Sequence, residues 1–292
     1  MYDPSPGPPP SLCGPLYNAC IRFARLLQVS ESAEAASPHT LPTRALLLFS
    51  GPYRRPDGLA AKLRAKGWSV DQLDRLEGGY AADIRNPSVF SRIVSMIAAG
   101  EYGAVFLGIP CSTFSVCRIR SVPDGGPPQV RNSTHPYGIP HLEAGWEREV
   151  AASNNVTERS VFVALLAAAR GAIVIIENPV SCAPCSPWAR PEFSTHCPLW
   201  MLSIVRRWFA VARAESVDMC QCALGSPFMA PTTLAFTPNV APAMRALCNA
   251  RCPHGANAHP EQAFGKGAEG YRSARKSPYP SSMNECLACA IA

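Results

Sequence analysis

Three short runs of residues stand out along the chain because almost every position in them is hydrophobic. They are Ala45–Phe49, Gly103–Ile109 and Ala172–Ile176. Strands that are apolar at successive positions are typical of a parallel sheet, which is covered on both faces. The pattern therefore predicts three buried strands of one parallel sheet.

Segments of helical period lie between these runs. Apolar residues recur at intervals of three and four over 59–67, 87–99 and 156–170, and residues 68–74 alternate as a further strand. Strands that alternate with helices in this way predict βαβ units and an α/β fold. Beyond residue 215 both periods fade, while cysteine, histidine and proline become frequent.

The three apolar strands all end in segments that carry polar or special residues. These segments are Ser-Gly-Pro at 50–52, Pro-Cys-Ser at 110–112 and Glu-Asn-Pro at 177–179. Open α/β sheets bind ligands outside the carboxyl ends of their strands. We therefore expect the three segments to line one crevice.

The composition indicates a globular core with irregular segments attached. Of the 292 residues, 47% are hydrophobic and 16% are charged, which excludes a wholly disordered chain. Prolines crowd the two ends. We expect a flexible proline-rich arm over 1–40, a catalytic domain over 41–215, a small Cys/His-rich lobe over 216–270 and a C-terminal segment, 271–292, that returns to the catalytic domain.

Charge and cysteine content indicate which class of partner and which cell compartment to expect for the protein. The net charge of +6 is compatible with a polyanionic partner such as nucleic acid. The opening residues lack the basic and apolar regions of a secretory signal, so the 13 cysteines are expected to be reduced in an intracellular protein. No apolar run reaches the length of a membrane span, so no membrane partner is expected.

Cys111 and Glu177 are the residues best suited to chemistry at the predicted crevice. Backbone N–H groups of the turn after Cys111 can stabilise a thiolate, and Pro110 fixes the approach of the chain. Glu177 follows a dry strand, so its pKa is expected to be raised, as a proton donor requires. A nucleophile and an acid are thus expected at one sheet edge.

These blocks resemble the DNA (cytosine-5) methyltransferases, and most closely divergent algal members, some of them carried by retroelements. The similarity rests on Phe-Ser-Gly at 49–51, Pro-Cys-Ser-Thr-Phe-Ser at 110–115 and Glu-Asn-Pro at 177–179, and it spans residues 45 to 290. It implies a class I S-adenosylmethionine-dependent methyltransferase, Rossmann-like, with a mostly parallel sheet covered by helices on both faces and a small irregular lobe. For a eukaryotic source it also implies a nuclear location.

The resemblance assigns roles at the catalytic position. Cys111 would add to C6 of a flipped-out cytosine, Glu177 would donate to N3, and Asn178 would orient Glu177 or the base. The cofactor-binding residues implied are Phe49, Ser50, Gly51, Asp74 or else Asp71, Asp83, Ile84 and Pro110. Asp74 is preferred for the ribose hydroxyls because it ends the second strand. Tyr279, Pro280 and Asn284 resemble the segment that packs beside the cofactor.

DNA contacts are expected from three places. Ser112 and Ser115 follow the catalytic cysteine, and an insert over 117–155 is expected to cover the site as a lid whose Arg118, Arg120 and Arg131 contact phosphates. Gln221 resembles the first residue of the family's Gln-x-Arg-x-Arg motif. Neither arginine of the motif is present, because Ala223 and Gly225 stand at their positions.

A possible zinc site lies in the small lobe. Cys248, Cys252, His254 and His259 have a spacing tolerable for a structural zinc ion, and Cys220 and Cys222 could add ligands. The alternative is a loop of reduced cysteines and exposed histidines.

Two other functions remain open at this stage. The missing arginines favour a catalytically weak DNA-binding relative with the same fold. Methylation of cytosine C5 in RNA would instead use a cysteine on a different strand, for which Cys182 and Cys185 are the candidates. Adenine-N6 methylation is disfavoured, because the catalytic strand ends in Ile-Pro-Cys-Ser and not in an Asn/Asp-Pro-Pro-aromatic motif.

Overall fold

The structure is a computed structural model of the chain. It describes residues 41–119, 126–184, 186–254, 258–259 and 278–292, and the backbone alone at 266–267 and 270–271. The predicted arm over 1–40, Arg120 and Cys185 lie outside the described residues.

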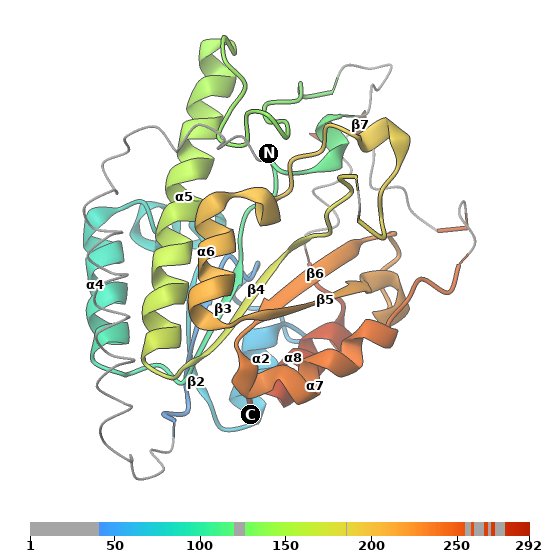
Figure 1. The fold of residues 1–292 in the computed structure, drawn as a ribbon. Coiled ribbons are helices and arrows are strands. Elements are labelled where there is room, and N and C mark those ends of the chain that lie inside the picture. The colour runs from blue at the N-terminus through green and yellow to red at the C-terminus, as the bar shows by residue number, and fades with distance from the viewer. Residues whose placement is uncertain are drawn as a thin grey trace.

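A six-stranded sheet forms the centre of the molecule, in the order β2-β1-β3-β4-β6-β5 (Figure 1). Its strands are β1 (Arg44–Leu48), β2 (Ser69–Leu73), β3 (Ala104–Gly108), β4 (Ile173–Pro179), β5 (Glu215–Cys220) and β6 (Pro231–Phe236). Strands β2, β1, β3 and β4 are parallel, and β6 is antiparallel to both β4 and β5. The described chain is therefore an α/β protein with a mixed sheet, compatible with a Rossmann-like fold.

Helices cover both faces of this sheet (Figure 1). One face carries α4 (Pro87–Ala98), α5 (Ala144–Ala169) and α6 (Ser203–Ala212), and the other carries α2 (Leu59–Ala65), α7 (Ala241–Arg245) and α8 (Ser281–Ile291). The remaining elements are α3 (Arg75–Gly78), the small hairpin β7 (Lys266–Gly267) and β8 (Gly270–Tyr271), and 3-10 turns at Gly79–Ala82, Val116–Arg118, Pro191–Phe193, Leu199–Met201, Gln221–Leu224, Pro238–Val240 and Ala246–Asn249.

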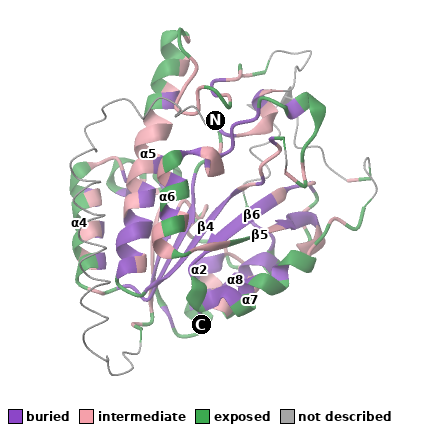
Figure 2. Cartoon of the chain, in the orientation of Figure 1, coloured by how far each residue is buried: buried purple, intermediate pink, exposed green. Residues whose placement is uncertain are grey.

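The alternation of side chains along each strand explains the continuous apolar runs. In β1, Leu46 and Leu48 join the core under α4 and α5, whereas Ala45 and Leu47 join the core under α2 and α8. A strand buried on both faces needs an apolar residue at every position. Figure 2 shows the result as a buried sheet between helices whose outer surfaces are exposed.

Two parts of the fold differ from the sequence prediction. Residues 215–220 and 231–236 are strands of the main sheet, so an irregular lobe does not begin at residue 216. Helix α5 begins at Ala144 and not at 156, so the expected insert contains its first turns. In both places polar residues interrupt the periodicity, and contacts with distant segments supply the stability that local pattern does not.

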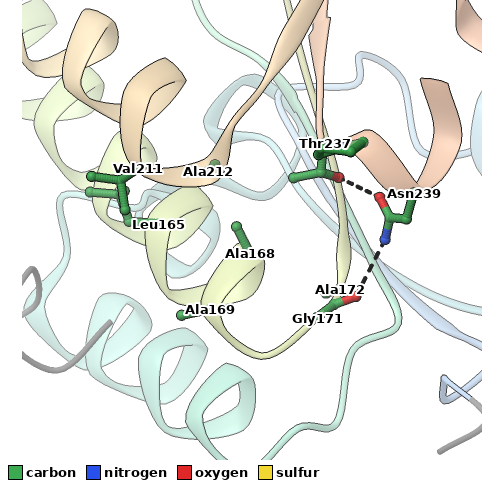
Figure 3. Close-up of a pocket in the computed structure, with 10 residues that line it drawn as sticks. Leu165, Ala168, Ala169, Gly171, Ala172, Val211, Ala212, Thr237 and Asn239 are labelled. Atoms are coloured by element: carbon green, nitrogen blue, oxygen red, sulfur yellow. Dashed lines mark hydrogen bonds between the residues drawn. The ribbon is translucent and has the colours of Figure 1, made fainter. Parts of the chain in front are cut away.

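A pocket of about 250 Å³ lies at the edge of the sheet opposite the predicted crevice. Small and apolar side chains of α5 and α6 line it together with the turn after β6 (Figure 3). Asn239 closes one side, where it accepts from Thr237 and donates to the carbonyl of Gly171. Among the described residues, no helix combines the length and hydrophobicity needed to cross a membrane.

Candidate active site

The register of the sheet brings the predicted catalytic residues to one edge. Gly108, the last residue of β3, pairs with Glu177 on β4, and Leu48 at the end of β1 pairs with Leu107 on β3. Cys111 follows β3 by three residues and is partly buried, whereas Glu177 is 8% exposed. Cys111 and Glu177 thus lie at the carboxyl ends of neighbouring parallel strands.

A tyrosine from the C-terminal segment completes this edge. The hydroxyl of Tyr279 donates to Glu177 Oε2 at 2.6 Å, and its ring meets Phe106 edge-on at 5.8 Å. Burial raises the pKa of Tyr279 well above its usual value, and the charges of Glu177 and Cys111 act in the same direction. Tyr279 therefore stays protonated and gives Glu177 a permanent donor.

Gly108 makes room for that hydroxyl. A Cβ at this position would lie 2.5 Å from Tyr279 Oη and 2.8 Å from the carbonyl oxygen of Phe49. Only glycine allows the three segments to approach so closely. The family resemblance implies a place beside the cofactor for Tyr279, but neither the contact with Glu177 nor the need for glycine at 108 was predicted.

Asn178 has a different partner from the one expected. Its Nδ2 donates to the carbonyl of Ile109 at 2.7 Å, which ties β4 to the segment that leads into Cys111. Its Oδ1 is buried and has no partner among the described residues. Asn178 thus positions the loop that contains Cys111, called the cysteine loop below. The lone pairs of its Oδ1 remain available to accept a hydrogen bond. Pro110 is exposed at the start of that loop.

The turn after β1 and the end of β2, where cofactor-binding residues were predicted, lie in contact with each other. Gly51 has φ +83° and donates its N–H to Asp74 Oδ2 at 3.3 Å, while nothing lies within 4 Å of a Cβ built on it. Asp74 Oδ1 caps α3 by accepting from Leu76 N. Ser50 accepts from Gln72 at 3.3 Å, and Phe49 adopts φ +58°. The structure thus provides an open glycine turn beside an acceptor carboxylate.

Asp71 does not belong to this group. It lies in the middle of the edge strand β2, where it pairs with Leu46, away from the carboxyl ends of the strands. Its carboxylate accepts from Tyr102 at 2.7 Å and pairs with Arg44 at 2.9 Å. The alternative assignment of Asp71 to the ribose hydroxyls is therefore wrong in this structure.

The side chains of Asp83 and Ile84 both make contacts inside the protein. Burial favours the neutral form of Asp83, but hydrogen bonds from Arg85, the shortest 2.6 Å, outweigh it and lower the pKa of the carboxyl. The side chain of Ile84 is 2% exposed and packs in the core under α4. Neither side chain is presented to a ligand here, because Arg85 holds both oxygens of Asp83.

Two of the three arginines predicted to contact phosphates, Arg118 and Arg131, hold the insert together instead. Arg118 is buried, donates to the carbonyl of Ser112 at 2.6 Å, pairs with Glu149 and lies over the ring of Trp146. These contacts fix the loop that follows Cys111. Arg118 is thus a structural residue of the insert, which corrects the prediction.

Arg131 is even more enclosed. It is 2% exposed, donates to the carbonyl of Pro136 and lies 4.4 Å from the centre of the Phe114 ring. Burial lowers its pKa to about 10. A phosphate cannot reach a guanidinium covered in this way, so this prediction is also corrected.

The other residues expected at DNA divide between surface and interior. Ser112 is exposed at the tip of the loop, and Ser115 Oγ accepts from Cys117 N. Gln221 is 3% exposed, donates to Thr232 Oγ1 at 2.8 Å and leaves its Oε1 buried without a partner among the described residues. Of these residues, Ser112 alone lies openly on the surface.

A cluster fit for a zinc ion lies beside Gln221. It consists of Cys222, Cys252, His254 and His259, whose ligand atoms all lie within 4.8 Å of one another. Cys248 is exposed, and its thiol faces Asn249 Oδ1 at 3.8 Å. The predicted ligand set is thus corrected at one position, where Cys222 replaces Cys248.

Replacing Tyr279 by phenylalanine is expected to change how stability depends on pH. Above pH 10 the unfolded phenol loses its proton while the folded one keeps it, so stability from Tyr279 is full below pH 10 and falls with rising pH by up to about 1.4 kcal/mol per unit. Urea unfolding between pH 9 and 11 should show a shallower decline for Tyr279→Phe. The exposed Tyr80→Phe should keep the wild-type slope, and equal slopes in all three proteins would contradict the buried contact.

Comparisons with known proteins do not assign the chain to a family. No protein-family model matches the sequence, and no curated protein matches it.

Proposed function

We propose that this protein transfers a methyl group from S-adenosylmethionine to C5 of cytosine in DNA. The observation that carries the proposal is the emergence of Cys111 and Glu177 from the carboxyl ends of paired strands β3 and β4. A thiol nucleophile beside a carboxyl is what addition to a pyrimidine ring requires. The resemblance at residues 49–51, 110–115 and 177–179 selects cytosine.

Cys111 and Glu177 would act on different atoms of the cytosine ring. The Cys111 thiolate forms a bond to C6, and a proton from Glu177 to N3 offsets the charge that builds up. C5 then becomes nucleophilic enough to take the methyl group. Loss of the C5 proton to water and return of the N3 proton to Glu177 allow the bond between sulfur and C6 to break, which restores both Cys111 and Glu177. Tyr279 positions Glu177 throughout, because it donates to Oε2.

The geometry around Gly51 supports a cofactor at this edge. The open space over Gly51 admits a ligand close to the backbone, and Asp74 keeps acceptor lone pairs for ribose hydroxyls beyond its bonds to Gly51 and Leu76. S-adenosylmethionine would supply the methyl group there. Asp83 fits less well, because Arg85 already occupies its oxygens.

DNA as the substrate is supported by charge and by the position of the cysteine loop. The net charge of +6 favours association with a polyanion. Extrusion of a base from a duplex costs a few kcal/mol, which the pocket must offset. Ser112, exposed directly after Cys111, is the residue of the loop best placed to meet the extruded nucleotide.

A second candidate is a catalytically weak DNA-binding relative with the same fold. Ala223 and Gly225 stand where the family carries arginines, and Arg118 and Arg131 of the insert are buried in internal contacts. Such a protein would bind DNA and keep the flipped-base pocket without efficient turnover.

Methyl transfer from tritium-labelled S-adenosylmethionine to a mixture of DNA and RNA tests the proposal. We expect label in DNA, and we expect a duplex that contains 5-fluorocytosine to form an adduct stable on a denaturing gel, because fluorine blocks release from C5. Label in RNA alone, with the adduct lost in Cys182→Ala, would instead establish the RNA reaction. DNA binding without label or adduct would establish the weak relative and refute the enzyme.

A further inference from the structure

Cys222, Cys252, His254 and His259 join two segments that are far apart in the chain. Cys222 lies in the 3-10 turn Gln221–Leu224 directly after β5, and the other three follow the turn Ala246–Asn249. Strand β5 runs parallel to β4, since both are antiparallel to β6, so the cluster lies at the same edge of the sheet as Glu177. The two segments already touch, because Cys220 N donates to the carbonyl of Ala250 at 2.7 Å.

The distances within the cluster suit one tetrahedral ion. Cys252 Sγ lies 3.2 Å from His259 Nε2 and 3.9 Å from His254 Nδ1. Zinc bonds of about 2.3 Å to sulfur and about 2.0 Å to nitrogen place two such ligands roughly 3.5 Å apart. The two observed distances bracket that value, and all four ligand atoms lie within 4.8 Å of one another, so metal binding requires the widest pair to close by at most about an ångström.

The donor set favours zinc in a structural role. Two thiolates and two imidazoles are a common zinc set, and four protein ligands leave a tetrahedral ion no open position for water or substrate. A second thiol, Cys220 Sγ, lies 3.2 Å from Cys222 Sγ in the buried wall behind the cluster. Cys220 can donate to the Cys222 thiolate and so fix its orientation.

We propose that one zinc ion, bound by Cys222, Cys252, His254 and His259, fastens residues 252–254 and His259 to the end of β5 and thereby fixes Gln221. Gln221 precedes a ligand directly, and its amide donates to Thr232 on β6. The metal holds the backbone on one side of Gln221 while the sheet holds the other. The zinc ion takes no part in methyl transfer, so it can be tested whether or not the protein is an enzyme.

Metal analysis of the purified full-length chain provides the first test. We expect one zinc ion per chain in the wild type and in Cys248→Ser, whose exposed thiol lies outside the cluster, and a loss of zinc in Cys252→Ser and in His259→Ala. Replacement by Co²⁺ should give the intense visible absorption of a tetrahedral thiolate site. A wild type that binds neither metal, or a Cys252→Ser variant that retains zinc, would overturn the ligand set.

Hydrogen exchange tests the effect on Gln221. Amides at 220–226 are expected to exchange at least tenfold faster in Cys252→Ser than in Cys248→Ser, while amides of β1 exchange equally in both. Unchanged exchange at 220–226 in a variant that has lost zinc would overturn the coupling to Gln221. Equal acceleration throughout the sheet would overturn it as well, because the effect would then be general unfolding.

Discussion

Replacing Cys111 by alanine is expected to abolish the covalent adduct with 5-fluorocytosine DNA and to lower methyl transfer by at least about a thousandfold. In the proposed mechanism the bond from Cys111 to C6 makes C5 reactive, and alanine cannot form that bond. Cys111 is partly buried in a loop that Arg118 holds through the carbonyl of Ser112. Alanine fits this position without a cavity of consequence, so folding should be unaffected.

Cys117→Ala is the matched control for this variant. Cys117 lies in the same loop and is likewise partly buried, but it is not at the end of the strand. We expect it to retain both the adduct and methyl transfer. Wild-type amounts of adduct in Cys111→Ala, measured on a denaturing gel, would remove Cys111 from the role of nucleophile.

Gly108→Ala is expected to cost about 1–3 kcal/mol of unfolding free energy and to disrupt the contact between Tyr279 and Glu177. The added methyl group would lie 2.5 Å from Tyr279 Oη and 2.8 Å from the carbonyl of Phe49, which belongs to the backbone and cannot rotate away. Tyr279 must therefore move, and Glu177 loses its donor. Urea unfolding measures the first effect.

Gly145→Ala is the matched control for Gly108→Ala. Gly145 lies in the first turn of α5, and nothing stands within 4 Å of a Cβ built there. Alanine in a helix is favourable relative to glycine, so stability should rise by less than about 1 kcal/mol. A Gly108→Ala variant as stable as Gly145→Ala would contradict the close approach at the end of β3.

The core of the sheet could be predicted from sequence because burial on both faces leaves a local signal. The apolar runs correspond to β1, β3 and β4, and their ends carry the predicted catalytic and cofactor residues. Strand β5 left no such signal. It is an edge strand with polar residues such as Asp218, and it forms because it pairs with β6.

The side-chain partners could not be predicted because they depend on contacts over long sequence distances. A sequence shows that Arg118 and Arg131 are charged, but not that Glu149 and the ring of Phe114 enclose them. Asp83 was missed for a different reason, because its partner Arg85 is only two residues away but a motif match does not show that Arg85 occupies its oxygens. Cys222 joins the metal cluster only because β5 brings it to Cys252, His254 and His259.

The donor to Glu177 also has a consequence for the order in which the protein is made. Tyr279 follows Glu177 by 102 positions, so a growing chain leaves the ribosome with strands β1 to β4 complete and the carboxylate still lacking its phenol. The space beside Gly108, which the hydroxyl group of Tyr279 occupies in the finished fold, must stay open until the C-terminal segment packs against the sheet. Synthesis thus completes this end of the sheet last, and a chain that stops before residue 279 would carry Cys111 and Glu177 without the hydroxyl group that donates to Glu177.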